Sequence, residues 1–362
     1  MPWLFVIARN SSFTYKGSAV DVKKVARELG VRYVLEGSVR KAGNRVRITG
    51  QLIDTATGAH IWADRFDGAL DDIFELQDQV ASSVVGAIEP KLRQSEIARA
   101  TRKPTESLEA YDLYLRALAE FHTYTWESLG RAILLLKQAL VVDPSYAPAA
   151  AMIGWCRINQ SAQSLEPAVE QETAESVRLA REAIEVGKDD PDSLWMAAIT
   201  LGLFAGAHAT AASAIERALT LNSNSAHAQM ASAWLSCYRN EPDLAVEPLQ
   251  RAMRLSPLDP LGYLFSAGLA LAHMVGGRYA TAIEWADRCL QEQPRLRVAL
   301  RIRVASCAHL GRDSKARESL RQLLELQPEL TLSLTRLQLP PVAPEVAALY
   351  VEGLRKAGLP EG

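Results

Sequence analysis

The sequence predicts a mainly α-helical protein in which a smaller α+β module precedes an α-solenoid of repeated helix pairs. Two patterns predict this: apolar and proline positions that recur at intervals near 34 residues, and a region before residue 70 in which apolar and polar residues alternate. A third observation is size, because 362 residues exceed what one hydrophobic core usually holds. The composition, with 48% hydrophobic and 23% charged residues, is that of a globular protein. We therefore expect two domains or one elongated array.

The first hundred residues are typical of an α+β module with an antiparallel meander. Residues 45–52 alternate between apolar and polar types, which is the period of a half-buried strand. Gly43-Asn44 and Gly58 supply the turns on either side of that strand. The expected elements are a buried strand at 3–8, a helix at 21–30, strands at 33–39, 45–52 and 60–66, and a helix at 70–95.

Two charged groups in this module allow a functional and a structural interpretation. The basic hairpin residues could contact phosphate or nucleic acid, but a solvated strand face that discourages edge pairing is the favoured interpretation. The acidic residues could hold a cation, but their spacing is not that of a calcium loop, and helix capping is favoured. The basic residues are Arg40, Lys41, Arg45 and Arg47, and the acidic residues are Asp64, Asp67, Asp71 and Asp72.

Four runs, at residues 5–13, 26–40, 52–54 and 61–67, resemble the TolB-like (FlgO-like) domain, and the resemblance covers residues 4–97. Bacterial proteins with this domain join it to C-terminal tetratricopeptide repeats and to an N-terminal output domain. That output domain is a class III adenylate/guanylate cyclase or a winged-helix DNA-binding domain. The strand and helix that open the family's domain have no counterpart here, so the resemblance implies a partial domain and a missing output domain.

The rest of the chain repeats with the period of the tetratricopeptide repeat. Ala132, Ala139 and Pro144 define offsets of 0, 7 and 12 that recur in later units. Small residues at the first two offsets let paired helices approach closely, and proline ends the second helix. Six units are expected over residues 107–328, after a partial TolB-like domain at 1–100 and before a capping helix and tail at 329–362. The capping helix is expected near 344–357, and residues 160–172 are expected to form a loop.

The familiar catalytic and cofactor patterns are absent from the sequence. We find no phosphate-binding glycine loop, no nucleophile elbow and no zinc-binding histidine or cysteine motif. Cys156, Cys237, Cys289 and Cys307 lie far apart in apolar stretches, which favours small core residues in a reducing compartment. We expect no enzymatic activity in this chain, no cofactor and no metal.

A repeat array binds partners, and its first helices line the concave face. Alignment of these helices places seven residues there: Trp155, His227, Met230, Trp234, Arg297, Arg301 and His309. Because Arg297 and Arg301 are one helical turn apart, we hypothesise that they hold an acidic or C-terminal carboxylate segment of a partner. The alternative is that both tryptophans pack between helices and both arginines are solvated.

Two functional hypotheses remain open at this stage. The first is a non-catalytic interaction module, which by resemblance is the sensory or regulatory part of a bacterial cyclic-nucleotide signalling protein. The second is the product of a cyclase or winged-helix regulator gene whose output domain is not in this chain. A net charge of −2 does not favour nucleic-acid binding, and no apolar stretch reaches the length of a membrane span. We expect a cytoplasmic protein that binds a protein or peptide, with oligomerisation left open.

Overall fold

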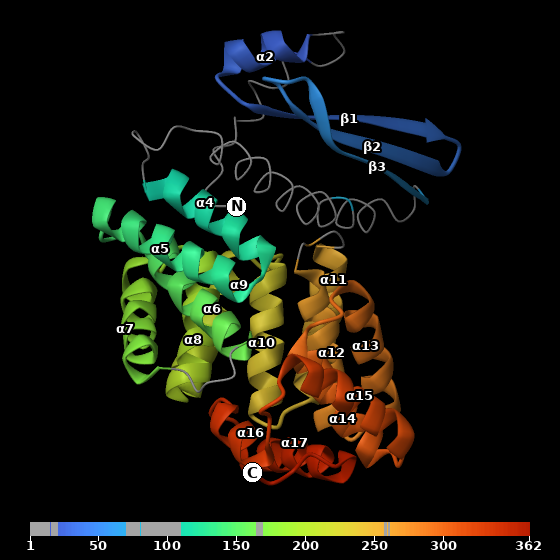
Figure 1. The fold of residues 1–362 in the computed structure, drawn as a ribbon. Coiled ribbons are helices and arrows are strands. Elements are labelled where there is room, and N and C mark those ends of the chain that lie inside the picture. The colour runs from blue at the N-terminus through green and yellow to red at the C-terminus, as the bar shows by residue number, and fades with distance from the viewer. Residues whose placement is uncertain are drawn as a thin grey trace. The chain divides into compact units, whose positions relative to one another are not determined.

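The computed structural model describes residue 15, residues 21–69, residue 80, residues 110–163 and 169–256, residue 259 and residues 261–362. The chain divides into two compact units (Figure 1). One comprises Met1–Ser95 with Leu255–Leu258, and the other Glu96–Arg254 with Asp259–Gly362. The expected strand at 3–8 and nearly all of the expected helix at 70–95 lie outside the described residues, as do Asp71 and Asp72.

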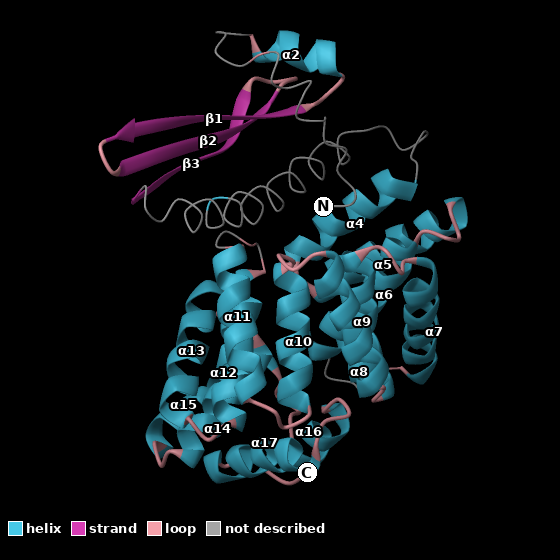
Figure 2. Cartoon of the chain, turned by 180° about the vertical axis from the view of Figure 1, so that it is seen from behind, coloured by secondary structure: helices cyan, strands magenta, loops and turns pink. Residues whose placement is uncertain are grey.

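Within residues 21–69, the first unit forms one helix and a three-stranded antiparallel sheet of order β1-β2-β3, as the alternating pattern predicts (Figure 2). Asp21 caps the helix by accepting a hydrogen bond from the Lys23 amide, and Gly30 ends it in a left-handed conformation. Ala42 pairs with Arg45, so the β1–β2 connection is a two-residue turn. The elements are α2 (Val22–Leu29), β1 (Tyr33–Ala42), β2 (Arg45–Asp54) and β3 (Ala59–Ala69).

One face of this sheet is the core face. Val46, Leu52 and Trp62 are buried, and the intervening β2 residues Arg45 and Arg47 are exposed. A side chain at Gly50 would meet the Trp62 ring at 3.0 Å, so glycine here lets the indole approach β2 closely. The period-2 pattern therefore separates an apolar face from a strongly polar one.

The second unit is an array of helix pairs, as the 34-residue period predicts (Figures 1 and 2). The described residues form a helix pair at each of the six expected units. The pairs are α4 (Ala110–Thr123) with α5 (Trp126–Val142), α6 (Ala147–Gln163) with α7 (Glu170–Val186), α8 (Pro191–Ala205) with α9 (His208–Leu221), α10 (Ala226–Tyr238) with α11 (Asp243–Leu255), α12 (Gly262–Val275) with α13 (Tyr279–Glu292), and α14 (Arg297–His309) with α15 (Asp313–Leu326).

The recurring small residues lie where helices cross. Ala132, Ala139 and Ala211 are completely buried, and so are their counterparts in the later units. The second helices α5, α13 and α15 each end two residues before a proline, because the residue before proline is disfavoured in the helical conformation. The offsets read from the sequence therefore mark the contacts that hold each pair together.

A left-handed residue turns the chain inside each of the five pairs whose connection lies wholly within the described residues. Glycine takes this conformation at Gly206, Gly277 and Gly311, where it costs no steric strain. Tyr124 and Asn240 hold the same place in the first and fourth pairs, with φ angles of 55° and 63°. The turn geometry is thus shared by units whose sequences differ.

Two expectations require adjustment at the ends of helices. The loop expected at 160–172 is shorter, because α6 continues to Gln163 and α7 begins at Glu170. The helix expected at 344–357 is α17 (Pro344–Ala357), which packs on α14, and a short helix that the pattern did not predict, α16 (Leu332–Gln338), precedes it. A side chain at Gly353 would lie 2.6 Å from the Ala305 Cα atom, so α17 crosses α14 at close range.

Candidate partner-binding surfaces

The first helices of the pairs pack on one another in sequence, from α4 through α14. Five of them contribute one ring each to a continuous row: Phe121, Trp155, Trp195, His227 and Phe265. Successive ring centroids are 6.2, 5.5, 5.4 and 6.0 Å apart. Rings at these separations attract one another beyond simple area burial. The row joins five consecutive units along one layer of the array.

The first helices of the pairs form the inner layer of the array. Contacts between units that are distant in the sequence also cross this layer. The ring of Tyr124, at the end of the first helix α4, lies 5.5 Å from that of Tyr263 at the start of α12. The Tyr124 hydroxyl donates to the Asn159 side chain at 2.7 Å, and Arg297 of α14 donates to the Gln163 carbonyl of α6. These contacts bring the first two units against the fifth and sixth. The chain itself therefore occupies part of the face that was expected to be an open groove.

Arg297 and Arg301 lie on α14, one turn apart as predicted, and both are half-buried. Arg301 donates to the side-chain oxygens of Gln327 and Gln338 at 2.8 and 2.9 Å, and Arg297 reaches the Leu326 carbonyl at 3.4 Å. Burial lowers the pKa of Arg301 to about 10, and burial followed by the charge of Arg295 lowers that of Arg297. Within the described residues neither forms an ion pair, so both charges are held by neutral oxygens.

The remaining predicted residues are placed in helix packing. Trp155 and Met230 are 7% and 1% exposed. The Trp234 indole N–H is buried, finds no acceptor among the described residues and packs by Tyr238 at 5.9 Å. His309 stacks on the Tyr279 ring at 5.0 Å, and its Nε2 lies 2.9 Å from the Leu349 carbonyl of α17.

His227 contacts both an aromatic ring and an acidic side chain. Its ring stacks on Trp195 with an angle of 15° between the planes, and its Nε2 lies 3.4 Å from Asp259. It thereby connects to Trp155 through Trp195, and Met230 and Trp234 follow it on α10 at intervals of three and four residues. The seven residues lie on the predicted first helices, and Trp155 and Met230 are buried among them.

The link between α16 and α17 packs against the C-terminal ends of the first helices α8 and α10. The Ala343 amide donates to the Tyr238 carbonyl at the end of α10, at 2.8 Å. A side chain at Gly206, which ends α8, would meet Pro341 at 3.4 Å. Glu361 near the C-terminus contacts α16. Its carboxylate forms an ion pair with Arg336 at 2.5 Å, and its backbone carbonyl accepts a hydrogen bond from the Ser333 amide.

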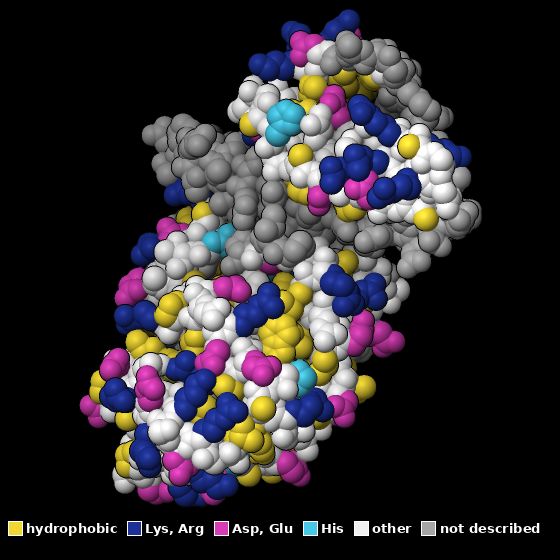
Figure 3. Space-filling view, turned by 90° about the vertical axis from the view of Figure 1, so that its right-hand side faces the viewer, with side chains coloured by type: hydrophobic (Ala, Val, Ile, Leu, Met, Phe, Trp, Pro, Cys, Tyr) yellow, Lys and Arg dark blue, Asp and Glu magenta, His cyan; other side chains and the backbone are white. Residues whose placement is uncertain are grey.

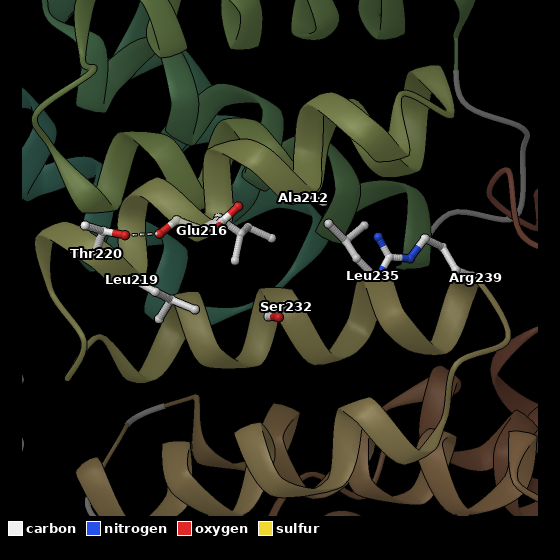
Figure 4. Close-up of a pocket in the computed structure, with 8 residues that line it drawn as sticks. Ala212, Glu216, Leu219, Thr220, Ser232, Leu235 and Arg239 are labelled. Atoms are coloured by element: carbon white, nitrogen blue, oxygen red, sulfur yellow. Dashed lines mark hydrogen bonds between the residues drawn. The ribbon is translucent and has the colours of Figure 1, made fainter.

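A groove that the sequence analysis missed lies between α9 and α10 (Figure 4). Its volume is about 430 Å³. It opens where α9 packs on α10 more loosely than α7 packs on α8. The repeat unit that contains α9 has Ser223 in place of the usual proline, but this departure does not itself indicate a groove. Its apolar lining is Ala212, Ile215, Leu219 and Leu235, and its polar lining is Glu216, Thr220, Ser232 and Arg239.

The cysteine thiols of the array are shifted away from reactivity. Burial raises the pKa of the Cys237 and Cys289 thiols to about 12, and it raises that of Cys156 further. All four cysteines are free and buried. Over the residues that the structure describes, no group of three His, Cys, Asp or Glu could hold a metal ion. In the same part of the chain, no helix combines the length and apolar character of a membrane span.

Comparison with known proteins supports the repeat architecture. No protein-family model matches the sequence. A protein of Rhizobium meliloti (strain 1021) named "Putative adenylate cyclase 3" is 41% identical to this chain over 198 residues. That match covers 55% of this chain and 34% of the Rhizobium protein, so the chain spans about a third of its relative's length.

Two solved structures share the fold at low identity. An IFIT1 monomeric mutant with Gppp-AAAA matches with a TM-score of 0.54 and 15% identity, over 81% of this chain and 66% of that one. The APC/C hetero-tetramer Cut9–Hcn1 matches with a TM-score of 0.51 and 13% identity, over 74% and 48%. At such identities the likeness concerns the fold alone. The chain is a mainly helical protein built from tetratricopeptide-like repeats.

Proposed function

We propose that this chain is a non-catalytic protein-interaction module. The observation that carries the proposal is the array of stacked helix pairs, whose inner layer runs unbroken from α4 to α14. Arrays of this kind present extended surfaces to partners and need no bound group for that role. The raised thiol pKa values and the packed inner histidines add no group suited to acid–base or nucleophilic chemistry.

The same proposal places the module in bacterial cyclic-nucleotide signalling, as a sensory or regulatory part. Its support is the 41% identity to a protein named as an adenylate cyclase, together with the TolB-like resemblance of residues 4–97. Four free, buried cysteines fit a reducing, cytoplasmic setting. The match over only 34% of the Rhizobium protein favours a second candidate, in which this sequence is the regulatory region of a longer cyclase or regulator.

The two candidates differ in the size of the native protein. An antibody against the repeats would isolate the protein from its source cells for intact-mass measurement. A mass near 39.6 kDa supports a separate adaptor, and a mass larger by a domain supports the longer protein. In parallel, purified chain should form no cyclic nucleotide from ATP or GTP. Turnover above that of a heat-inactivated sample would contradict the non-catalytic role.

For the partner contact, we propose that an acidic segment approaches the α14 arginines. Both guanidinium groups lack a carboxylate partner within the described residues, and a charge-assisted hydrogen bond to a carboxylate is stronger than one to a neutral oxygen. The partner would compete with neutral oxygens, chiefly the Gln338 side chain and the Gln163 carbonyl. Arg297 would contact the acidic segment directly. Arg301 would add to the positive electrostatic potential beside it.

Charge reversal tests this contact. The double variant Arg297→Glu with Arg301→Glu should lose the partner in a pull-down from source cells while it keeps its helical circular dichroism. Arg181→Glu with Arg321→Glu is the matched control, because both residues are exposed on second helices and the charge change is equal. Unchanged partner capture by the α14 variant would remove the acidic-segment proposal and leave the module proposal intact.

A further inference from the structure

The exposed face of the sheet in the first unit carries a concentrated positive charge. The strand register places Arg40 opposite Arg47, Arg47 opposite Asp67, and Thr49 opposite Arg65. Arg45 lies on the same face, two residues before Arg47. Figure 3 shows Lys and Arg side chains gathered on the first unit with few acidic side chains between them. We call Arg40, Arg45, Arg47 and Arg65 the sheet arginines.

The acidic residues of this face do not balance the sheet arginines. Asp67 is shared by two of them, since its Oδ1 lies 2.6 Å from the Arg47 Nε and its Oδ2 lies 3.3 Å from the Arg65 Nε. Glu36 accepts instead from Gln51 at 2.9 Å. Neither Arg40 nor Arg45 forms an ion pair with any residue that the structure describes, so at least two guanidinium groups are free.

The arrangement of these charges itself favours an anion. Like charges directly opposite each other on neighbouring strands destabilise a sheet, and Arg40 faces Arg47 in this way. A bound carboxylate between them would convert repulsion into two charge-assisted hydrogen bonds. Asp67 already demonstrates the geometry, because two guanidinium groups converge on its carboxylate. Four exposed arginines on a flat face can repeat that contact with a carboxylate from another chain.

We propose that the sheet arginines bind an acidic segment of a partner protein, rich in Asp or Glu. Arg45 and Arg47 are two residues apart on one strand, which spaces them by roughly 7 Å. Alternate side chains of an extended peptide repeat at the same distance, so successive carboxylates can meet successive guanidinium groups. This surface is separate from the α14 arginines and does not depend on the function proposed for them.

The composition of the face disfavours other polyanions. A membrane-binding surface needs apolar side chains that enter the bilayer interface, and the uncharged residues here are small or polar. Single-stranded nucleic acid is held by stacking on aromatic rings, and no described residue paired beside the sheet arginines carries one. Duplex DNA requires many phosphate contacts, whereas the chain has a net charge of −2. The uncharged residues are Ser38, Ala42, Thr49, Gln51, Ala63 and Ala69.

The direct test uses the full chain and a fluorescein-labelled octaglutamate peptide at low ionic strength, with anisotropy as the readout. The variant Arg40→Glu with Arg45→Glu should bind at least about fivefold more weakly than the wild type, because exposed charges tune association with charged partners. Arg181→Glu with Arg321→Glu gives the same charge change on exposed sites of the other unit and should bind as the wild type does. Thermal unfolding of each variant checks that the sheet remains folded.

A second variant moves affinity in the opposite direction. Asp67→Asn removes the internal carboxylate that competes for Arg47 and Arg65, and it keeps the shape of the side chain. We expect octaglutamate to bind this variant about two- to fivefold more tightly, since two further guanidinium groups become available. A rise here and a fall in the Arg40/Arg45 variant would together locate the contact on this face.

Several outcomes would overturn the proposal. One is no binding of octaglutamate by the wild type, and another is equal loss in the sheet and control variants. A third is binding of phosphatidylserine-containing vesicles or of a 20-base-pair duplex through the sheet arginines when octaglutamate does not bind. Loss of native partner capture by the α14 variant leaves this result unaffected, so the two proposals fail independently.

Discussion

Two groups of arginines illustrate how differently the two units use the same side chain. The α14 pair lies half-buried and is held by side-chain and backbone oxygens that carry no net charge. The sheet arginines lie on an exposed face, where two of them share Asp67 and two have no ion-pair partner among the described residues. In the sequence both groups are spaced arginines beside apolar residues. The difference teaches that burial, more than spacing, decides how many of an arginine's donors the fold already uses, and hence how many a partner would have to compete for.

The largest expected contrast concerns packing. Phe121 is 1% exposed and opens the aromatic row, so Phe121→Ala should lower the free energy of unfolding by about 3–5 kcal/mol. Val39 on the sheet is 69% exposed, and Val39→Ala should change the free energy of unfolding by less than about 0.5 kcal/mol. Urea denaturation followed by circular dichroism measures both. Similar losses in the two variants would contradict the assignment of the row as a structural core.

A smaller contrast separates the two arginine groups. Arg301→Ala removes hydrogen bonds to Gln327 and Gln338 and should cost about 1–3 kcal/mol, because their oxygens lose a charged donor. Arg40→Ala should be neutral or slightly stabilising, since it relieves repulsion with Arg47.

Differential scanning calorimetry of the two variants beside the wild type checks this. A stability loss in Arg40→Ala equal to that in Arg301→Ala would show that the sheet arginine also fastens the fold. It would then be a poor candidate for partner contact.

The smallest expected effect is a loss of sheet stability at acidic pH. The hydrogen bond from Arg47, with the charges of Arg47, Arg65 and Arg45, holds the pKa of Asp67 below its ordinary value of 3.8. A carboxyl with a depressed pKa stabilises the fold above its ordinary pKa, and this contribution is lost as the pH falls through the lowered value. Because Asp67 is exposed, the loss should be small.

Hydrogen exchange of the β2 and β3 amides between about pH 5 and pH 2 detects such a local loss. After correction for the intrinsic pH dependence of exchange, wild-type protection should fall with pH more than that of Asp67→Asn. Identical pH profiles would mean that the Asp67 pairs add nothing to the sheet.

Local patterns allowed much of this structure to be predicted. The recurring alanines, and the prolines that follow most of the second helices, predicted the helix pairs, and alternation around Val46 and Ile48 predicted the strands. The closure of the array was not predictable in this way. The contact of Tyr124 with Tyr263 depends on small rotations that accumulate over several units, and no single unit encodes them.

The site was harder to predict than the fold for a related reason. Helix alignment placed Trp155 and Met230 correctly on first helices, but it could not show that neighbouring helices and the α16–α17 link cover that layer. The strand alternation did show that Arg45 and Arg47 share a wet face. It could not show that the carboxylate of Asp67 would reach two of the arginines there.

Arginine footprinting tests the central contrast most directly. The full chain is treated with phenylglyoxal with and without octaglutamate, and modification is read at each arginine by mass spectrometry. The account predicts that Arg40 and Arg45 react quickly in the free protein and are protected by the peptide, whereas Arg301 reacts slowly in both samples. Equal reactivity of Arg40 and Arg45 with and without octaglutamate, or protection confined to the helical array, would contradict it.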